Sequence, residues 1–270
     1  MGLTIVGLGL GDVEDVTLKG YKAVKKADVV YLEIYTSLLI DSDKKKLEEF
    51  YGREILEADR ICVEEQNDLF LNESKTKNVV LLVGGDPFSA TTHSDLYYKA
   101  LELGLNVNVV HNASIMNAVG IIGLQLYRFG ETVSIPFFQD KWRPSSFFDK
   151  IVQNYESNLH TLCLLDIKVK ERTDENILAN KMVFEPPRFM SINIAIEQIF
   201  EVNEDRLVAR LGSVNKVVKS GKLEELKYFD FGPPLHSLVI CMLNNLIPYG
   251  GSVIIVSIHP EPLSCNCLKG

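Results

Sequence analysis

The chain has 270 residues, of which 46% are hydrophobic and 24% are charged, and its formal net charge is −8 at pH 7. This composition is typical of a soluble globular protein with a real core, and the length allows one large or two modest domains. The acidic balance excludes broad nucleic-acid binding, which would need a basic face. The same acidic charge is compatible with docking to a protein that has a basic patch.

Cysteine usage and hydropathy predict a cytoplasmic protein. The five cysteines are an odd number scattered at positions 62, 163, 241, 265 and 267, which favours reduced thiols in the cytosol. Cys265 and Cys267 have too few potential partner ligands for a zinc site, so no metal is expected. No apolar run approaches the roughly 18 residues that a membrane helix needs, and the N-terminus lacks the basic start of a signal peptide.

The N-terminal half alternates between predicted strands and helices. Leu3–Val6 predicts a first strand, and Thr17 predicts the N-cap of the next helix. A second strand at Val29–Leu32 completes a β-α-β unit. The other predictions for this half are an exposed helix at 43–51, loop and helix at 57–78, a strand at 79–83, a helix near 94–103 that Gly104 ends, and a strand at 107–110.

The C-terminal half begins with an unusually apolar segment. From Ile115 to Leu126, apolar residues would lie on several faces of a helix, which favours burial or a subunit interface. Further strands are predicted at 132–138, 159–167, 207–211, 235–243 and 252–258, and helices at 144–152 and 191–202. We therefore predict an α/β protein with two α/β domains, residues 1–112 and 113–270.

Residues 79–92, VVLLVGGDPFSATT, are the main candidate for a ligand-binding turn. A short apolar run that ends at Gly84-Gly85-Asp86-Pro87 predicts a buried parallel strand followed by a turn. Ligands of open α/β sheets bind beyond the carboxyl ends of the strands. The two glycines allow close approach of the backbone, and Asp86 offers an acceptor. The alternative is an ordinary corner between a strand and a helix.

A second glycine-rich loop, GLGLGD at 7–12, follows the first strand. A dinucleotide fingerprint needs G-x-G-x-x-G, but here the third glycine comes one residue early. The loop is followed by three carboxylates, from Asp12, Glu14 and Asp15, which disfavour a pyrophosphate and favour a cationic or zwitterionic ligand. S-adenosylmethionine is compatible with both loops, and NAD is kept as a minor alternative.

Several segments together resemble the diphthine synthase family, within the wider group of tetrapyrrole-methylase-like methyltransferases. The similarity covers nearly the whole chain and fails only in about the last fifteen residues. The segments that resemble the family most specifically are GLGLGD at 7–12, GGDPFSATTHSDL at 84–96, HNASIMNAVGIIGLQLYRFGETVSIPFF at 111–138, LHTLCLLDIKVKE at 159–171, EPPRFMS at 185–191 and FGPPLHSLVI at 231–240. The resemblance implies two α/β domains with the cofactor in the cleft between them.

The resemblance also implies an activity: methylation of a modified histidine of translation elongation factor 2 by S-adenosylmethionine, with S-adenosylhomocysteine as product. The acceptor is the amino group of the 3-amino-3-carboxypropyl arm on that histidine. The residues of these motifs are similar to those of the eukaryotic members, which add four methyl groups and produce diphthine methyl ester. Three N-methylations that give diphthine, or a related corrin or porphyrin methylase, are the alternatives. The family is usually a homodimer.

The cofactor positions of the family match residues from both halves of the chain. Ser89 stands where the family has glycine, which puts any need for a bare Cα there in doubt. Read without the family, Asp86 could equally be a turn residue, Ser114 a helix N-cap and His236 a core histidine. The matching positions are Leu10, Asp86, Ser89, Ser114, Ile115, Leu165, Leu211 and His236.

Two further features complete the candidate residues. His93 begins a predicted helix near the same turn and is a candidate for substrate contact. A basic set beyond the strand at 159–167 is either a solvated face or a surface that steers the elongation factor. The basic set consists of Lys168, Lys170, Arg172 and Arg188. The sequence nominates no catalytic base.

Overall fold

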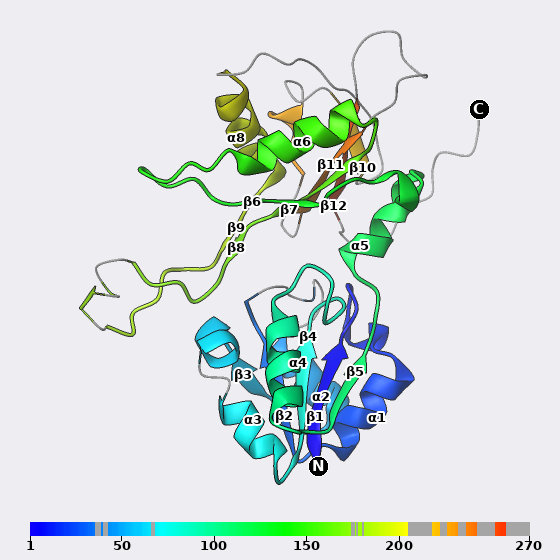
Figure 1. Cartoon of the computed structure of the whole chain (residues 1–270), viewed down its shortest axis with the longest axis vertical. Helices are drawn as coiled ribbons and strands as arrows, with labels where there is room; N and C mark the ends of the chain where they lie inside the picture. Colours follow the sequence, from blue (N-terminus) through cyan, green and yellow to red (C-terminus); the bar gives the residue numbers. More distant parts are fainter. Residues whose placement is uncertain are drawn as a thin grey trace. The chain divides into compact units, whose positions relative to one another are not determined.

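The computed structural model describes residues 1–35, 39, 43–65, 68–173, 176, 178–179, 181–204, 218–221, 226–231, 236–241 and 252–257. The chain folds into two compact units, which are described separately here (Figure 1). The first unit contains Met1–Ile121 and Ile167–Arg188, and the second contains Ile122–Asp166 and Phe189–Gly270.

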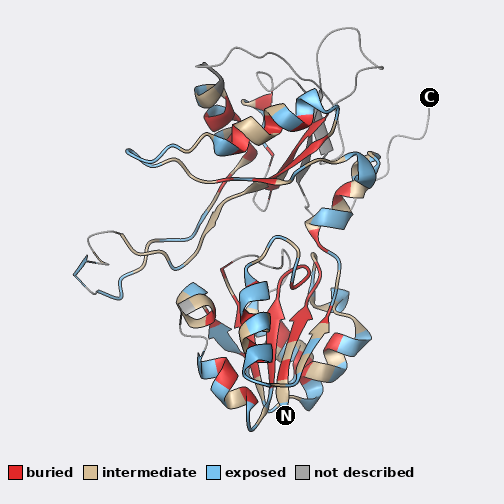
Figure 2. Ribbon diagram, in the orientation of Figure 1, coloured by how far each residue is buried: buried red, intermediate tan, exposed pale blue. Residues whose placement is uncertain are grey.

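A parallel sheet of five strands forms the centre of the first unit, in the order β3-β2-β4-β1-β5. The central strand β4 is buried at five of its six positions, as expected for a parallel strand covered on both faces (Figure 2). The strands are β1 (Gly2–Gly7), β2 (Val29–Glu33), β3 (Leu56–Ala58), β4 (Asn78–Val83) and β5 (Val107–Val110).

Helices cover both faces of this sheet because alternate strand residues point to opposite sides. Val80 and Leu82 pack in one core with α1 (Leu18–Lys26) and α2 (Lys44–Tyr51). Leu81 and its alternating neighbours pack in the other core. The helices of that second core are α3 (Asp68–Ser74) and α4 (His93–Glu102). The α/β prediction is therefore confirmed for this unit.

Helix ends follow their sequence signals. The Thr17 hydroxyl accepts a hydrogen bond from the Gly20 N–H at 3.1 Å, so its predicted capping role is confirmed. Gly104 adopts φ +69 just after α4, as a helix-ending glycine does. The helix predicted at 43–51 exists, but it is only partly exposed, since it buries Leu47 and Tyr51.

The second unit has a mixed sheet in the order β10-β12-β11-β7-β6. Only β6 and β7 are parallel; the other neighbours are antiparallel. Two helices, α6 (Ser146–Glu156) and α8 (Ile192–Glu204), share one apolar core with strands of this sheet. The strands are β6 (Val133–Ile135), β7 (Thr161–Leu165), β10 (Val218–Gly221), β11 (His236–Cys241) and β12 (Ser252–Ser257). The strand predicted at 207–211 lies outside the described residues.

The segment Ile167–Arg188 belongs to the first unit although it follows a strand of the second. It begins and ends in a short two-stranded ribbon, β8 (Ile167–Lys168) and β9 (Arg188–Phe189). Two ion pairs attach it to β3 and the residues just after it: Lys170 Nζ lies 3.0 Å from Glu57 Oε2, and Arg60 Nη1 lies 3.2 Å from Glu171 Oε1. The predicted division into 1–112 and 113–270 did not include this return, and that division stays a prediction.

The prediction of a long apolar helix from Ile115 is wrong. The helix α5 (Ile115–Ala118) has four residues and continues as a 3-10 turn to Ile122. Gly123 then adopts φ +82, a left-handed conformation that a helix cannot continue through. The apolar side chains of this segment are partly exposed: Ile121 is 72% exposed and Tyr127 is 80% exposed.

The interpretation of 57–78 as loop and helix missed the short strand β3 and a π-helical turn at Ile61–Glu65. A three-residue strand has no measurable periodicity, so pattern alone could not reveal it. Within the described part of the chain, no helix is long and apolar enough to cross a membrane.

The burial of His93 predicts a pH dependence of stability. The side chain is 0% exposed, and burial lowers its pKa from 6.5 to about 4, although the Pro87 carbonyl and Glu64 favour the charged form. Unfolding restores the ordinary pKa, so the unfolded chain binds a proton first as pH falls. The free energy of unfolding should therefore decrease between pH 6.5 and 4, by an amount on the order of 3 kcal/mol. Urea unfolding of wild type and His93→Gln at several pH values would test this, and equal pH slopes would contradict it.

A second prediction concerns Gly130 in the second unit. A Cβ at this position would overlap the side-chain amide of Asn154. That buried amide accepts from Glu131 N–H at 3.0 Å and donates to the Thr161 hydroxyl at 3.0 Å. Gly130→Ala should lower the free energy of unfolding by about 1–3 kcal/mol. In an Asn154→Ala background, Gly130→Ala should lower the free energy of unfolding by much less, because the amide that it overlaps is gone. An equal loss in both backgrounds of this double-mutant cycle would refute the clash.

Candidate functional site

The two glycine loops of the sequence lie against each other at the carboxyl edge of the parallel sheet. Gly85 N–H donates to the Gly9 carbonyl at 2.8 Å, and Gly9 N–H donates back to the Gly85 carbonyl at 3.2 Å. Both residues have positive φ, +82 for Gly9 and +72 for Gly85. A Cβ on Gly7 would lie 2.6 Å from the Gly85 carbonyl oxygen, so this approach requires glycine.

Asp15 occupies the N–H groups of the first loop. Its Oδ2 accepts from Gly11 N–H at 2.7 Å and from Leu10 N–H at 3.2 Å. A bound pyrophosphate would need such free N–H groups at the loop. The structure therefore gives a physical reason why this loop is a poor dinucleotide site, in agreement with the expectation from its acidic neighbours.

Asp86 is the most connected residue at this edge, with an exposed fraction of 7%. Its Oδ1 accepts from Phe88 N–H at 2.9 Å and from the Ser89 hydroxyl at 3.4 Å. Its Oδ2 accepts from Asn112 N–H at 3.1 Å and lies 2.8 Å from His111 Nδ1. The carboxylate thus fixes its own loop after β4 and joins it to the end of β5.

These contacts keep the Asp86 carboxylate charged. Burial alone would raise its pKa, but the Phe88 and Asn112 N–H groups and His111 outweigh burial and hold the pKa below its usual range. The stabilising bonds to Asp86 are consequently present throughout the neutral range and are lost only in strong acid. The edge of the sheet therefore presents a permanent buried negative charge.

Ser114 and Ile115 lie where β5 leads into α5. The Ser114 hydroxyl accepts from Met116 N–H at 3.3 Å, and Asn117 accepts from Ser114 N–H at 2.9 Å, which is a capping box. The N-cap interpretation of Ser114 is therefore correct. Its Cβ lies 3.7 Å from the place where a Cβ on Gly85 would lie, so the serine also borders the second glycine loop.

Ser89, which the family resemblance matched to a glycine, is accommodated without a left-handed backbone conformation. The residue with positive φ in this loop is Ala90, at +60, one position later. Ser89 N–H donates to the Asp86 carbonyl at 3.3 Å, and the hydroxyl bonds the Asp86 carboxylate as described above. The bare Cα of glycine is therefore not required at position 89 by the backbone.

Leu165 and His236 lie together in the second unit. Leu165 ends β7 and His236 begins β11, and the antiparallel register pairs Leu164 with Ser237. The two residues are therefore neighbours at one end of that sheet. His236 is buried and its ring lies 6.1 Å from the ring of Phe231. Leu211 lies outside the described residues.

The sequence did not single out His111 and Asn112, which the structure places on Asp86. The signal was present, because both residues follow β5 at the same carboxyl edge as the GGDP turn. Asn112 also joins the loops directly: its Nδ2 donates to the carbonyls of Gly7 and Asp15, both at 3.0 Å. Side chains that join loops in this way follow no known sequence motif, so pattern alone did not identify them.

Most of the basic set is paired with carboxylates of the first unit. Lys168 Nζ lies 3.4 Å from Glu171 Oε2, and the Lys170 pair with Glu57 is described above. Arg188 Nη2 lies 3.3 Å from Glu185 Oε2. These pairs reduce the positive field that the set could offer to a partner. A steering role for these residues stays a prediction.

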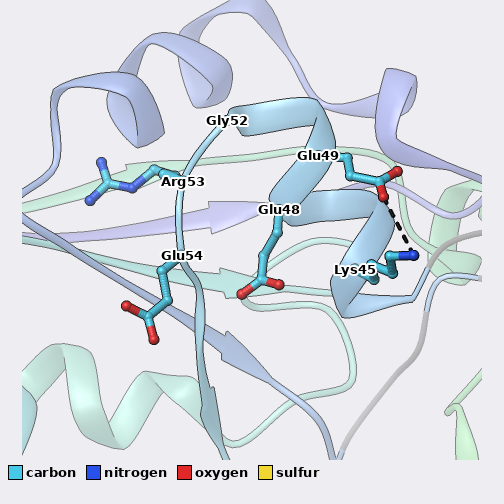
Figure 3. A pocket seen from close by; sticks show the side chains of 6 residues that line it. All are labelled: Lys45, Glu48, Glu49, Gly52, Arg53 and Glu54. Carbon is cyan, nitrogen blue, oxygen red and sulfur yellow. Dashed lines mark ion pairs between the residues drawn. The ribbon is translucent and has the colours of Figure 1, made fainter.

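An open hollow of about 560 Å³ lies beside α2 and is lined by charged side chains (Figure 3). Its lining includes Arg53 and Glu48, which have structural partners: Arg53 donates to the Val24 and Ala27 carbonyls, and Glu48 accepts from Ile55 N–H. Residues 52–54 precede β3, so the hollow is near the amino edge of the sheet. Ligands of such sheets bind at the opposite edge.

The donors and acceptors of the loop edge fit a cationic ligand. The N–H groups of Gly9, Leu10 and Gly11 are already bonded, whereas the carboxylate of Asp86 retains its charge. Such an edge suits a sulfonium or an amine better than a phosphate. The predicted cofactor residues of the first unit, from Leu10 to Ile115, all lie on the loops that meet here.

Comparison with known proteins agrees with this geometry. The family model for tetrapyrrole (corrin/porphyrin) methylases matches residues 2–227. The diphthine methyl ester synthase of Homo sapiens is 48% identical over 254 residues, which cover 88% of this chain and 89% of that protein. The diphthine methyl ester synthase of Yarrowia lipolytica is 49% identical over 250 residues, covering 88% and 83%.

A solved structure extends the similarity to the fold. A crystal structure of diphthine synthase has a TM-score of 0.74 and 36% identity, and the match covers 88% of this chain and 89% of that one. The family resemblance that the motifs indicated is thereby confirmed. The chain belongs to the diphthine methyl ester synthases within the tetrapyrrole methylase family.

Proposed function

We propose that this protein transfers methyl groups from S-adenosylmethionine to the 3-amino-3-carboxypropyl arm on a histidine of translation elongation factor 2. Membership of the family makes the chain a methyltransferase of diphthamide biosynthesis. The observation that supports the cofactor is the edge of the first unit, where two glycine loops meet beside a buried carboxylate that stays charged.

In the first unit, the cofactor would be held by the loops that contain Leu10, Asp86 and Ser89 and by the start of α5 at Ser114 and Ile115. In the second unit, Leu165, Leu211 and His236 are the proposed contacts. When bound, S-adenosylmethionine supplies an electrophilic methyl group on a sulfonium. Asp86 would contribute electrostatically, because its negative charge attracts the sulfonium cation.

The chain's other contribution is alignment. In-line displacement at a methyl carbon needs the amine, carbon and sulfur in a row, and rigid loops supply that order. The amine must be neutral, and an α-amino group titrates near 7.7–8.0 in model peptides, so a fraction is neutral at pH 7. No strong base is therefore needed for the first transfer.

Four methylations, three on nitrogen and one on the carboxylate, are our preferred outcome, because the relatives cited above are named diphthine methyl ester synthases. Three N-methylations that give diphthine are the alternative. A small-molecule corrin or porphyrin acceptor is the other alternative, which the same fold supports in the wider family.

Assembly and location follow from the same proposal. A homodimer would cover apolar side chains that the shortened α5 segment leaves exposed, such as Ile121 and Tyr127. Because elongation factor 2 acts in translation, we propose that the enzyme works in the cytoplasm.

Mass spectrometry of elongation factor 2 gives the direct test. The factor with the unmethylated arm would be incubated with the enzyme and S-adenosylmethionine, and the mass increments would count the methyl groups. We expect four increments on one histidine. Three increments would select the alternative that gives diphthine. A factor that gains none, while a tetrapyrrole precursor is methylated, would refute the proposed acceptor.

A second prediction concerns the cofactor residues. Asp86→Asn and His236→Ala should each weaken S-adenosylhomocysteine binding by about tenfold, because a charge-assisted bond or a shaped wall is lost. Calorimetry would measure the affinity, and thermal unfolding would confirm that each variant is folded.

Each variant has a control of the same residue type beside the same sheet. Asp28 joins β2 and β4 at the opposite edge, where its Oδ2 accepts from Asn78 N–H at 2.7 Å. His160 is a buried histidine just before β7. Asp28→Asn and His160→Ala should leave the affinity unchanged. Undiminished affinity in folded Asp86→Asn and His236→Ala would remove both assignments.

A further inference from the structure

A second polar cluster lies at the carboxyl edge of the first unit's sheet, after strands β2, β3 and β4. Its members follow three parallel strands, so they share one edge of the sheet. Tyr35 comes after β2, Arg60 and Glu64 after β3, and Thr92 and His93 after β4. The sheet order β3-β2-β4-β1-β5 puts β4 between this cluster and the first glycine loop.

Hydrogen bonds and ion pairs connect the cluster. The Thr92 hydroxyl donates to Glu64 Oε1 at 2.8 Å, although Thr92 stands at the N-cap of α4, where such a hydroxyl would normally bond the helix backbone. Tyr35 Oη lies 3.5 Å from the same hydroxyl. Arg60 Nε lies 4.0 Å from Glu64 Oε2, and its guanidinium lies 5.4 Å from the centre of the Tyr35 ring.

His93 gives the cluster an unsatisfied buried group. It is fully buried, and neither ring nitrogen forms a well-shaped hydrogen bond among the described residues, although the nearby Pro87 carbonyl favours the charged ring. Its ring lies 6.3 Å from that of Tyr35. Buried polar atoms are normally paired, and exceptions are common where a protein binds or reacts.

The positive member of the cluster already binds a carboxylate. Arg60 Nη1 lies 3.2 Å from Glu171 Oε1 of the returning segment, and the Arg60 side chain is 47% exposed. The half-exposed guanidinium therefore has the geometry for a carboxylate, and a ligand carboxylate would replace that of Glu171. Glu64 lies beside it as an acceptor for an ammonium group. An arginine and a glutamate side by side complement the two charges of an α-amino acid.

We propose that Arg60 and Glu64 bind an α-amino-acid head group, with Arg60 on its carboxylate and Glu64 on its amino group. Thr92 and Tyr35 are positioning residues that orient Glu64 and Arg60. Two molecules of the proposed reaction contain this head group: the 3-amino-3-carboxypropyl arm of the acceptor and the methionine end of the cofactor. The inference rests on the proposed function for these two sources.

The loop after β4 links this cluster to the cofactor edge. It begins with Gly84-Gly85-Asp86 and ends with Thr92 and His93, and the Thr91 hydroxyl bonds the Pro87 carbonyl inside it. A ligand head group bound by Glu64 would therefore lie one short loop away from the proposed cofactor contacts. Both candidate sources of the head group are consistent with this arrangement.

The test compares Arg60→Ala and Glu64→Gln with a matched pair in the second unit. Arg143 has nearly the same exposure, at 49%, forms an ion pair with Glu201, and lies 5.6 Å from the Phe138 ring centre. Arg143→Ala and Glu201→Gln therefore control for the loss of an exposed ion pair and a ring contact. Calorimetry would give S-adenosylhomocysteine affinity, and steady-state kinetics would give KM and kcat for the modified elongation factor.

We expect each cluster variant to lose about tenfold in one parameter, with both controls unchanged. A raised acceptor KM with normal S-adenosylhomocysteine affinity assigns the acceptor arm. A weakened S-adenosylhomocysteine affinity assigns the methionine end. If folded variants match their controls in both measurements, the proposal is wrong. Should Arg60→Ala not fold, Arg60→Lys, which keeps the charge but not the planar fork, should show a smaller loss in the same parameter.

The wild-type enzyme separates this proposal from the proposed function. If it adds no methyl group to the elongation factor, the proposed acceptor fails, and the calorimetric comparison alone decides whether the cluster binds an amino-acid head group. Thr92→Val gives a further readout. It should change the same parameter as Glu64→Gln, because the Thr92 hydroxyl orients the Glu64 carboxylate.

Discussion

The buried carboxylate of Asp86 is the interaction on which the rest of the candidate site depends. It accepts hydrogen bonds from two backbone N–H groups, on Phe88 and Asn112, and it binds His111. These bonds connect the ends of β4 and β5 and hold the second glycine loop where Gly85 can pair with Gly9. A single charged group thereby fixes three loops and leaves a negative potential where a cation can bind.

The carboxyl edge of the first unit's sheet has two parts with different side-chain chemistry. At the ends of β1 and β5 and the start of the loop after β4, close backbone contacts and one carboxylate dominate. At the ends of β2 and β3, an arginine, a glutamate and a tyrosine lie beside Thr92, which ends the loop after β4. Parallel strands make this division possible, because every loop that follows a strand reaches the same edge. The helices that cover the two faces bury the apolar residues of β4, and hydrogen bonds between the loops join them at that edge. Rigid loops suit a reaction whose main requirement is alignment.

The sequence predicted most of this fold, and its failures have physical causes. Strong local signals, such as the continuous apolar run of β4 and the cap at Thr17, gave correct elements. The long helix predicted from Ile115 was wrong because the prediction relied on apolar composition, whereas Gly123 has a left-handed conformation that ends the helical path. Motif residues such as Asp86 and Ser114 were identified, but their partners were not. Glu64 bonds Thr92, 28 residues later, only through the tertiary fold, and no local pattern encodes that contact. Likewise, the return of 167–188 to the first unit depends on ion pairs between distant residues.

Hydrogen–deuterium exchange with and without S-adenosylhomocysteine tests the central claim most directly, because it reports on the backbone N–H groups of the loops themselves. If the joined glycine loops form the cofactor edge, the ligand should slow exchange in peptides that contain residues 8–12, 84–90 and 113–116. NAD at the same concentration should leave these peptides unchanged. Slower exchange confined to the hollow at 45–54, with no effect at the three loops, would contradict the account.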